Sequence, residues 1–165
     1  MAVSVSDYPN VRERAAILGY KIPGDVILLP WNFGGPELEE ELFDTVTAPI
    51  VEQFLREADI PATRLEKNGT KLQTIHFKAL DWIGPVIFIA AQMLTNNPEI
   101  ANNVLTRILE YLGTTFFKGV AGPKQTRIEF VIEKTEGKKY VDVQYDGPYE
   151  GAKELIDILE KTIKD

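Results

Sequence analysis

The chain contains no cysteine and only one histidine, His76. A chain without cysteine forms no disulfide bond, no thiolate metal site and no iron–sulfur cluster, and it has no cysteine nucleophile. A single histidine also excludes a metal site built from several imidazoles. Because the side chains that most often hold metals and cofactors are missing, we expect neither a metal site nor a cofactor.

Positive charge is also in short supply. The 165 residues include 25 acidic and 18 basic side chains, which gives a formal net charge of −7 and a pI of about 4.9. A chain of this charge presents no basic field to nucleic-acid phosphates or to anionic lipid headgroups. We therefore expect no nucleic-acid partner.

An apolar run long enough to cross a membrane is the third absence. The most apolar stretch, "DWIGPVIFIAAQML" at residues 81–94, is shorter than the roughly 20 residues that a spanning helix needs. The first residues, "MAVSVSDYPNVRER", lack the basic segment and apolar core of a secretory signal. These patterns predict a cytoplasmic protein without a membrane span. Peripheral attachment to a membrane stays open only if the apolar stretch turns outward.

The same apolar stretch determines the expected core. Gly84-Pro85 favours the start of a helix, and the residues after it are apolar on nearly every side, which is typical of a surrounded helix. A strand from Val86 to Ala90 is the competing assignment. Burying the large apolar side chains from Val86 to Leu94 contributes on the order of 9–18 kcal/mol. We therefore expect a central core helix, and the alternative makes part of the surface near residues 82–117 an interface.

The rest of the pattern mixes strands with helices. Residues 26–29 are expected to form a buried strand, and two runs of strand-forming residues surround the turn dipeptides Asn68-Gly69 and Glu136-Gly137, which predicts two β-hairpins. In the second hairpin, apolar residues alternate with polar ones along each strand, and the apolar residues of the two strands are expected to pair across the hairpin. These residues are Ile128, Phe130 and Ile132 on the first strand and Val141, Val143 and Tyr145 on the second.

Capping residues, prolines and glycines mark the ends of the expected helices. The first helix is expected after Ser6 or Asp7 and ends at Gly19, and the second begins at Pro36. The third follows Thr47 and ends before Pro61, and the fourth begins at Pro98 after Asn97. A fifth helix closes the chain. The apolar faces of the last two are Ala101, Val104, Leu105, Ile108 and Leu112, and then Ala152, Leu155, Ile156, Leu159 and Ile163. These elements predict an α+β fold, with helices packed on a small mixed, largely antiparallel sheet. We expect one domain over residues 1–165, and any subdomain boundary near residue 80.

Two short segments combine aromatic and polar residues in a way that favours ligand binding. Trp31, Asn32 and Phe33 follow the expected buried strand, and α/β-type sheets often bind ligands where a strand ends. Asp81 and Trp82 precede the apolar stretch, where an acid beside a tryptophan can line a pocket or contact another protein. In the alternative interpretation both tryptophans only seal the edges of the core.

Catalytic machinery is sparse. His76 and Asp81 are the candidate acid–base residues, although a histidine bonded within a sheet is the other interpretation of His76. "KGVAGPK" lacks the spacing of a phosphate-binding loop, and "NFGGP" is followed by acids that would repel an anion. We therefore consider a non-catalytic protein before an enzyme.

The C-terminal half has a definite layout: an apolar segment, a long helix, a Gly/Pro link, the hairpin "RIEFVIEKTEGKKYVDVQY", the turn "DGPYEG" and a closing helix. This layout resembles small accessory domains encoded beside effector proteins in bacterial defence and conflict systems. The resemblance implies a bacterial, non-catalytic helper that docks onto a protein partner, and it assigns no functional residue.

Three functional hypotheses follow. The first is an accessory or protein-interaction domain that self-associates or belongs to a complex through apolar surface near residues 82–117. The second is a small enzyme that uses carboxylates or His76, with a pocket near Trp31 and Trp82. The third is a peripheral membrane-associated protein.

Overall fold

The computed structural model describes residues 2–22, 24–35, 42–65, 72–76 and 81–165. Its strands are β1 (Val3–Asp7), β2 (Val26–Leu29), β3 (Phe43–Thr45), β4 (Ala62–Arg64), β5 (Gln73–Ile75), β6 (Trp82–Ile89), β7 (Gln125–Thr135) and β8 (Lys139–Pro148). Its helices are α1 (Val11–Leu18), α2 (Ala48–Glu57), α3 (Ala91–Asn96), α4 (Ile100–Tyr111) and α5 (Glu154–Lys164). A π-helical turn, η2 (Leu112–Phe116), continues α4, and a 3-10 turn, η3 (Tyr149–Gly151), precedes α5.

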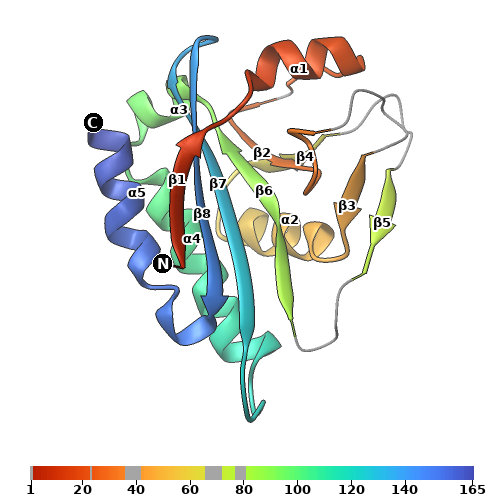
Figure 1. Cartoon of the computed structure of the whole chain (residues 1–165), viewed down its shortest axis with the longest axis vertical. Helices are drawn as coiled ribbons and strands as arrows, with labels where there is room; N and C mark the ends of the chain where they lie inside the picture. The colour runs from red at the N-terminus through yellow and green to blue at the C-terminus, as the bar shows by residue number, and fades with distance from the viewer. Residues whose placement is uncertain (1, 23, 36–41, 66–71, 77–80) are drawn as a thin grey trace.

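Six of the strands form one mixed sheet in the order β1-β8-β7-β6-β2-β4, and β3 pairs with β5 in a separate two-stranded sheet (Figure 1). Within the larger sheet, β6–β7 and β2–β4 are parallel and the other neighbours are antiparallel. The expected α+β fold with a mixed, mostly antiparallel sheet is therefore confirmed. The larger sheet takes strands from both sides of residue 80, namely β1, β2 and β4 from before it and β6, β7 and β8 from after it.

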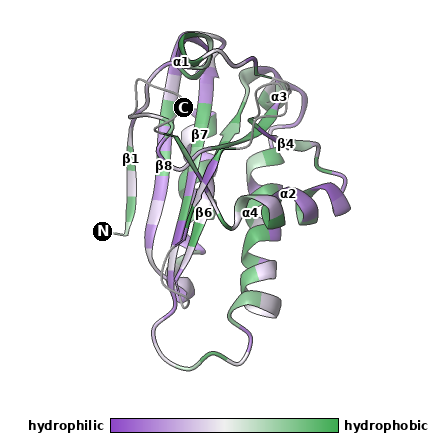
Figure 2. Ribbon diagram, turned by 90° about the vertical axis from the view of Figure 1, so that its right-hand side faces the viewer, coloured by the Kyte–Doolittle hydropathy of each residue, from purple (hydrophilic) through white to green (hydrophobic). Residues whose placement is uncertain are grey.

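Two apolar clusters lie on the two faces of the sheet, because alternate residues of a strand point to opposite sides. On the back face, α2, α4 and α5 pack against residues such as Phe130, and Figure 2 shows α2 and α4 together on this side. On the front face, α1 and the segments after β2 and β4 cover residues such as Val131. Among the described residues, no helix is long and apolar enough to cross a membrane.

The apolar stretch forms a strand and not the expected helix. Residues 82–89 are β6, which lies between β7 and β2 in the middle of the sheet, and α3 begins only at Ala91. Every residue from Val86 to Ile89 is at most 1% exposed, so the expected core position is right. A strand that is buried on both faces carries apolar residues at every position, and periodicity cannot distinguish it from a buried helix.

Gly84-Pro85 marks an irregularity in β6 instead of a helix start. The register between β6 and β7 shifts between Ile83 and Val86, which accommodates a proline that has no N–H to donate. Glycine is required at position 84 because a Cβ there would approach the Trp82 ring to 2.7 Å.

The second of the two expected hairpins is present. β7 and β8 pair as predicted, with Ile128 opposite Tyr145, Phe130 opposite Val143 and Ile132 opposite Val141. The Asn68-Gly69 turn lies outside the described residues. The described strands on either side of that turn, β4 and β5, pair with β2 and β3 and not with each other.

Several helix ends differ from the prediction. α1 begins after Asn10, whose side-chain oxygen accepts from the Glu13 N–H (3.0 Å), whereas Ser6 and Asp7 belong to β1 and cap nothing. Gly19 ends α1 as expected, with a φ of 87°. The helix expected from Pro36 lies mostly outside the described residues, and its last part is β3.

The other helices agree with the prediction. Thr47 precedes α2, although its hydroxyl donates to the Ile83 carbonyl (2.6 Å) and accepts no capping bond from the described N–H groups of the helix. The side chain of Asn97 accepts from the Glu99 N–H (3.3 Å), and α4 begins at the next residue, Ile100. The apolar face predicted for this helix is fully buried, as are Ala152, Leu155 and Leu159 at the closing helix.

Candidate functional site

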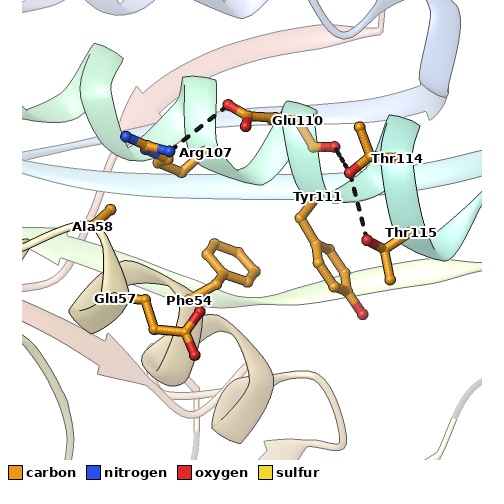
Figure 3. A pocket seen from close by; sticks show the side chains of 8 residues that line it. All are labelled: Phe54, Glu57, Ala58, Arg107, Glu110, Tyr111, Thr114 and Thr115. Carbon is orange, nitrogen blue, oxygen red and sulfur yellow. Dashed lines mark hydrogen bonds and ion pairs between the residues drawn. The ribbon is translucent and has the colours of Figure 1, made fainter.

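A groove follows the outward face of α4, beside α2 (Figure 3). Two adjoining hollows of about 440 and 420 Å³ form it, and Ala58, Arg107 and Glu110 line both of them. The first hollow is also lined by Phe54, Glu57, Tyr111, Thr114 and Thr115, and the second by Ile60, Asn103 and Thr106. We call this feature the α2–α4 groove.

The groove has an aromatic wall and a charged rim. Phe54 and Tyr111 are half-buried and stack with ring centroids 5.0 Å apart. The Tyr111 hydroxyl is protonated at neutral pH and can donate a hydrogen bond, and burial raises its pKa further above the ordinary value. Arg107 Nη1 lies 3.9 Å from Glu110 Oε2, with the two side chains 50% and 58% exposed. An ion pair this exposed contributes little stability, so both charges can bind a ligand at small cost.

Tyr149 explains why α4 ends in a wider π-helical turn. Its hydroxyl donates to the Leu109 carbonyl (3.0 Å) and competes for the acceptor that an α-helix would offer to the Gly113 N–H. A Cβ at Gly113 would lie 2.6 Å from this hydroxyl oxygen, so glycine is required there. The turn brings Thr114 and Thr115 to the end of the groove, and π-helical turns are frequent at functional sites.

A buried carboxyl pair lies on the front face of the sheet. Glu129 of β7 is 8% exposed and shares a hydrogen bond with Asp142 of β8. Burial, together with that hydrogen bond and the negative charge of Asp142, raises the pKa of Glu129 to about 8. The pair therefore holds one proton at neutral pH. Asp142 Oδ1 is buried and accepts no hydrogen bond from any described residue.

Polar groups surround this carboxyl pair. Arg127 Nη2 lies 3.4 Å from Glu129 Oε1, and the Gln144 amide oxygen accepts from Arg127 Nε and Nη2 at 3.2 Å each. Tyr8 lies close by, and burial and then the charges of Glu129 and Asp142 raise the pKa of its hydroxyl. The two carboxyl groups of Glu129 and Asp142 thus lie close to the Tyr8 hydroxyl. Ionisable groups this close together can transfer protons.

Arg14 lies on the same side of the sheet, on α1. Its Nε donates to the Phe33 carbonyl (2.5 Å), and its positive charge lowers the pKa of Tyr8 against the effect of burial. Its Nη2 atom is buried and makes no hydrogen bond to the residues that the structure describes. The carboxyl pair therefore has a cationic group within the same front layer.

A second acid on β7, Glu133, has a fully satisfied environment. It is 0% exposed and accepts hydrogen bonds from Arg12 Nε (2.8 Å), Tyr140 Oη (2.7 Å), and the N–H groups of Ala91 (2.9 Å) and Gly137 (3.2 Å). Burial alone would raise its pKa, but these donors outweigh burial and lower the pKa to about 2. Glu133 thus joins α1, the start of α3 and the β7–β8 turn, and it acts as a structural centre.

The segment Trp31–Phe33 serves to connect β2 with β3. The Trp31 N–H donates to the Phe43 carbonyl (3.2 Å), and Asn32 Oδ1 accepts from the Phe43 N–H (3.0 Å). Phe33 is 0% exposed and belongs to the front cluster. These contacts show that the segment Trp31–Phe33 forms a turn and fills part of the front core.

The other predicted site residues lie elsewhere. Trp82 is 1% exposed in the back cluster, so the sheet separates it from Phe33, and the structure does not bring the two aromatic segments into one pocket. Asp81 is half-buried, and His76 is exposed just after β5. No group of three or more acidic or histidine side chains in the described part of the chain could hold a metal ion.

Most apolar side chains near residues 82–117 are buried, and part of the surface that remains in this range lines the α2–α4 groove. The apolar side chains at residues 86–90 and the apolar stripe of α4 are buried in the core, whereas Leu109 and Tyr111 of α4 are only half-buried. Sequence reasoning also missed the carboxyl pair, although the predicted hairpin register contained a signal for it. That register places Glu129 opposite Gln144 and Asp142 two positions further along, opposite Val131, with both acids on the same face.

Fold and side chains together define a small α+β protein with an open groove between two helices and a protonated carboxyl pair under its front layer. Comparison of the chain with protein-family models, with curated proteins and with solved structures gives no match.

Proposed function

We propose that the protein is a non-catalytic interaction domain that binds a short polypeptide segment in the α2–α4 groove. The observation that carries this proposal is the continuity of the two hollows, which share three lining residues along the outward face of α4. Aromatic and arginine side chains in such a position are the residue types that dominate binding energy at protein interfaces.

The dimensions of the groove suit an extended peptide. From Asn103 to Thr115 the helical backbone advances about 18 Å, which equals about five residues of extended chain. Glu57 and Glu110 outnumber Arg107 among the charged lining residues. The preferred segment is therefore basic, with an apolar residue that packs on Phe54 and Tyr111.

A random peptide display library tests this proposal, because it samples many sequences and requires no identified partner. Peptides selected on the wild-type chain should be rich in Lys or Arg next to an apolar residue. Tyr111→Ala should weaken their binding at least about tenfold, and Glu110→Lys should remove the preference for basic residues. Ile17→Ser is the matched control, because Ile17 is 71% exposed on α1, away from the groove. Selected peptides that bind all variants equally would contradict the proposal.

An accessory role agrees with this binding function. The C-terminal layout resembles small helper domains of bacterial defence systems, and a helper of this kind would use such a groove to dock onto a protein partner. Enrichment of peptides that match a neighbouring protein of the same genome would identify that partner.

Acid–base catalysis is a second candidate, and the Glu129–Asp142 pair favours it. A carboxyl group with a pKa of about 8 can donate a proton at neutral pH, and Asp142 beside it can accept one. The test is hydrolysis of chromogenic glycosides and esters by the wild type and by the Glu129→Gln, Asp142→Asn and Glu136→Gln variants. Loss in the first two and retention in the third would support catalysis. No activity in the wild type would remove this candidate.

A further inference from the structure

Within the described part of the chain, β1 is an edge strand whose outer backbone groups pair with no other strand and are open to another chain. β8 is its partner in the six-stranded sheet, where the Tyr8 N–H donates to the Tyr140 carbonyl and the Asp146 N–H to the Ala2 carbonyl. Bonded and non-bonded pairs alternate along an antiparallel ladder. The even-numbered residues of β1 therefore bond to β8, and the backbone N–H and C=O groups at positions 3, 5 and 7 point away from the sheet.

β1 lacks most of the features that protect an edge strand, and Asp7 at its end is its one charged residue. Its sequence, "VSVSD", contains no lysine or proline, and its five pairs with β8 keep an unbroken register. Val5 is opposite Val143, a back-face core residue, yet the Val5 side chain is 53% exposed. An apolar side chain thus remains uncovered at the back of the edge.

α5 carries a self-complementary row of side chains beside this edge. It is the outermost helix on the side of the molecule where β1 lies (Figure 1). Glu160, Ile163 and Lys164 line a hollow shared with residues of α4, so this flank of α5 faces α4. By helical geometry the opposite flank carries Glu154, Ile158 and Lys161 and faces the β1 side.

We propose that two copies of the chain associate through their β1 strands, antiparallel and centred on Val5, with their α5 helices paired behind the new strand pair. In this register Val5 bonds to the partner's Val5 and Val3 to the partner's Asp7, which gives about six backbone hydrogen bonds. Each Asp7 faces a valine and not a second carboxylate, so no like charges lie opposite each other.

The charges of α5 favour a second copy as the occupant of this edge. A two-fold axis through Val5 makes the two α5 helices antiparallel, so Glu154 faces the partner's Lys161 and the two Ile158 side chains meet near the axis. Both charged residues are exposed and form no ion pair within the described chain. The two β8 strands would lie about 14 Å apart. At this separation of the β8 strands, the two α5 helices that flank them can bring their side chains into contact. This association uses a surface other than the α2–α4 groove and does not depend on the function proposed for it.

Sedimentation velocity across a concentration series up to about 500 µM tests the association. The wild type should show a monomer–dimer equilibrium. Val5→Lys should raise the dimer Kd at least about tenfold, because a charge then lies at the two-fold axis. Lys161→Glu should also weaken the dimer, and the double variant Glu154→Lys/Lys161→Glu should restore it, because the swap recreates the ion pair.

Lys164→Glu is the matched control, since it changes the same charge on the flank that faces α4. It should leave the dimer Kd within about threefold of the wild type. Circular dichroism of each variant separates lost association from lost folding. A wild type that stays monomeric throughout the series would overturn the proposal. A dimer that is indifferent to Val5→Lys, or a double variant that does not recover, would overturn it as well.

Discussion

Glu129 and Glu133 lie on the same strand and the same face of the sheet, four residues apart, and both are buried. Burial raises the pKa of Glu129 to about 8, whereas Glu133, which is buried more completely, has its pKa lowered to about 2. The difference comes from the neighbours. Glu133 receives an arginine, a tyrosine hydroxyl and two backbone N–H groups, whereas Glu129 faces a second carboxyl group.

This comparison shows that burial alone does not decide the charge of a carboxyl group. The number of donors that the fold supplies decides it. One end of the front face is thus a rigid, ionised anchor for α1 and α3. The other end stores a proton, and its ionisation depends on conditions near neutral pH.

Removing the anchor should have the largest effect. Glu133→Ala leaves Arg12, Tyr140 and two backbone N–H groups without their acceptor, and the free energy of unfolding should fall by about 3 kcal/mol. Urea unfolding followed by circular dichroism measures this change. Glu136→Ala, at an exposed position of the same turn, should change it by less than about 0.5 kcal/mol. Equal effects of the two substitutions would show that the Glu133 network adds nothing.

The carboxyl pair should make stability depend on pH between 4.5 and about 8. Between the ordinary pKa of 4.5 and about 8, folded Glu129 holds a proton that the unfolded chain has lost, so the free energy of unfolding falls as pH rises through this window. Glu129→Gln stays neutral and removes that fall. At about pH 9 the variant should be more stable than the wild type by about 2–4 kcal/mol, and at about pH 4 nearly equal to it. Thermal melts across the pH range measure this, and parallel curves for the two proteins would contradict the assignment.

Removing one hydrogen-bond donor from Glu133 should have a smaller effect and make its pKa less different from that of Glu129. Tyr140→Phe removes one donor (2.7 Å) from Glu133, which should lower the free energy of unfolding by about 1–2 kcal/mol at neutral pH. Because the pKa of Glu133 is lowered, its stabilisation is present above pH 4.5 and is lost as pH falls toward about 2. The variant should therefore begin acid unfolding at a higher pH than the wild type. An unchanged acid midpoint would exclude a contribution of Tyr140 to this carboxylate.

Local patterns in the sequence predicted several elements correctly. The strand at residues 26–29, the β7–β8 hairpin with its register and the buried stripe of α4 all follow from a spacing of two or of 3.6 residues. The same reasoning failed for β6, because a strand covered on both faces has no polar residue to reveal its period. It also failed for β1, where Ser6 and Asp7 were predicted to cap a helix. Only Val3 of this strand is buried, so its pattern shows no buried face.

The candidate sites were mostly beyond the reach of the sequence. Trp31 and Trp82 attracted attention as aromatic residues, but Trp82 is in the core and Trp31 belongs to a connecting turn. The α2–α4 groove joins two helices about 50 residues apart in the chain, and no local pattern marks such a contact.

The chain by itself determined which residues alternate, which must be buried and where most helices begin, because backbone geometry converts spacing directly into faces. Only the tertiary structure decided which strand stays at the edge and which carboxyl group keeps its proton. Arg12 and Glu133, separated by 121 positions, show the reason. The ionisation of a buried group depends on donors that come from distant segments, and those segments meet only when the sheet and its covering helices have assembled.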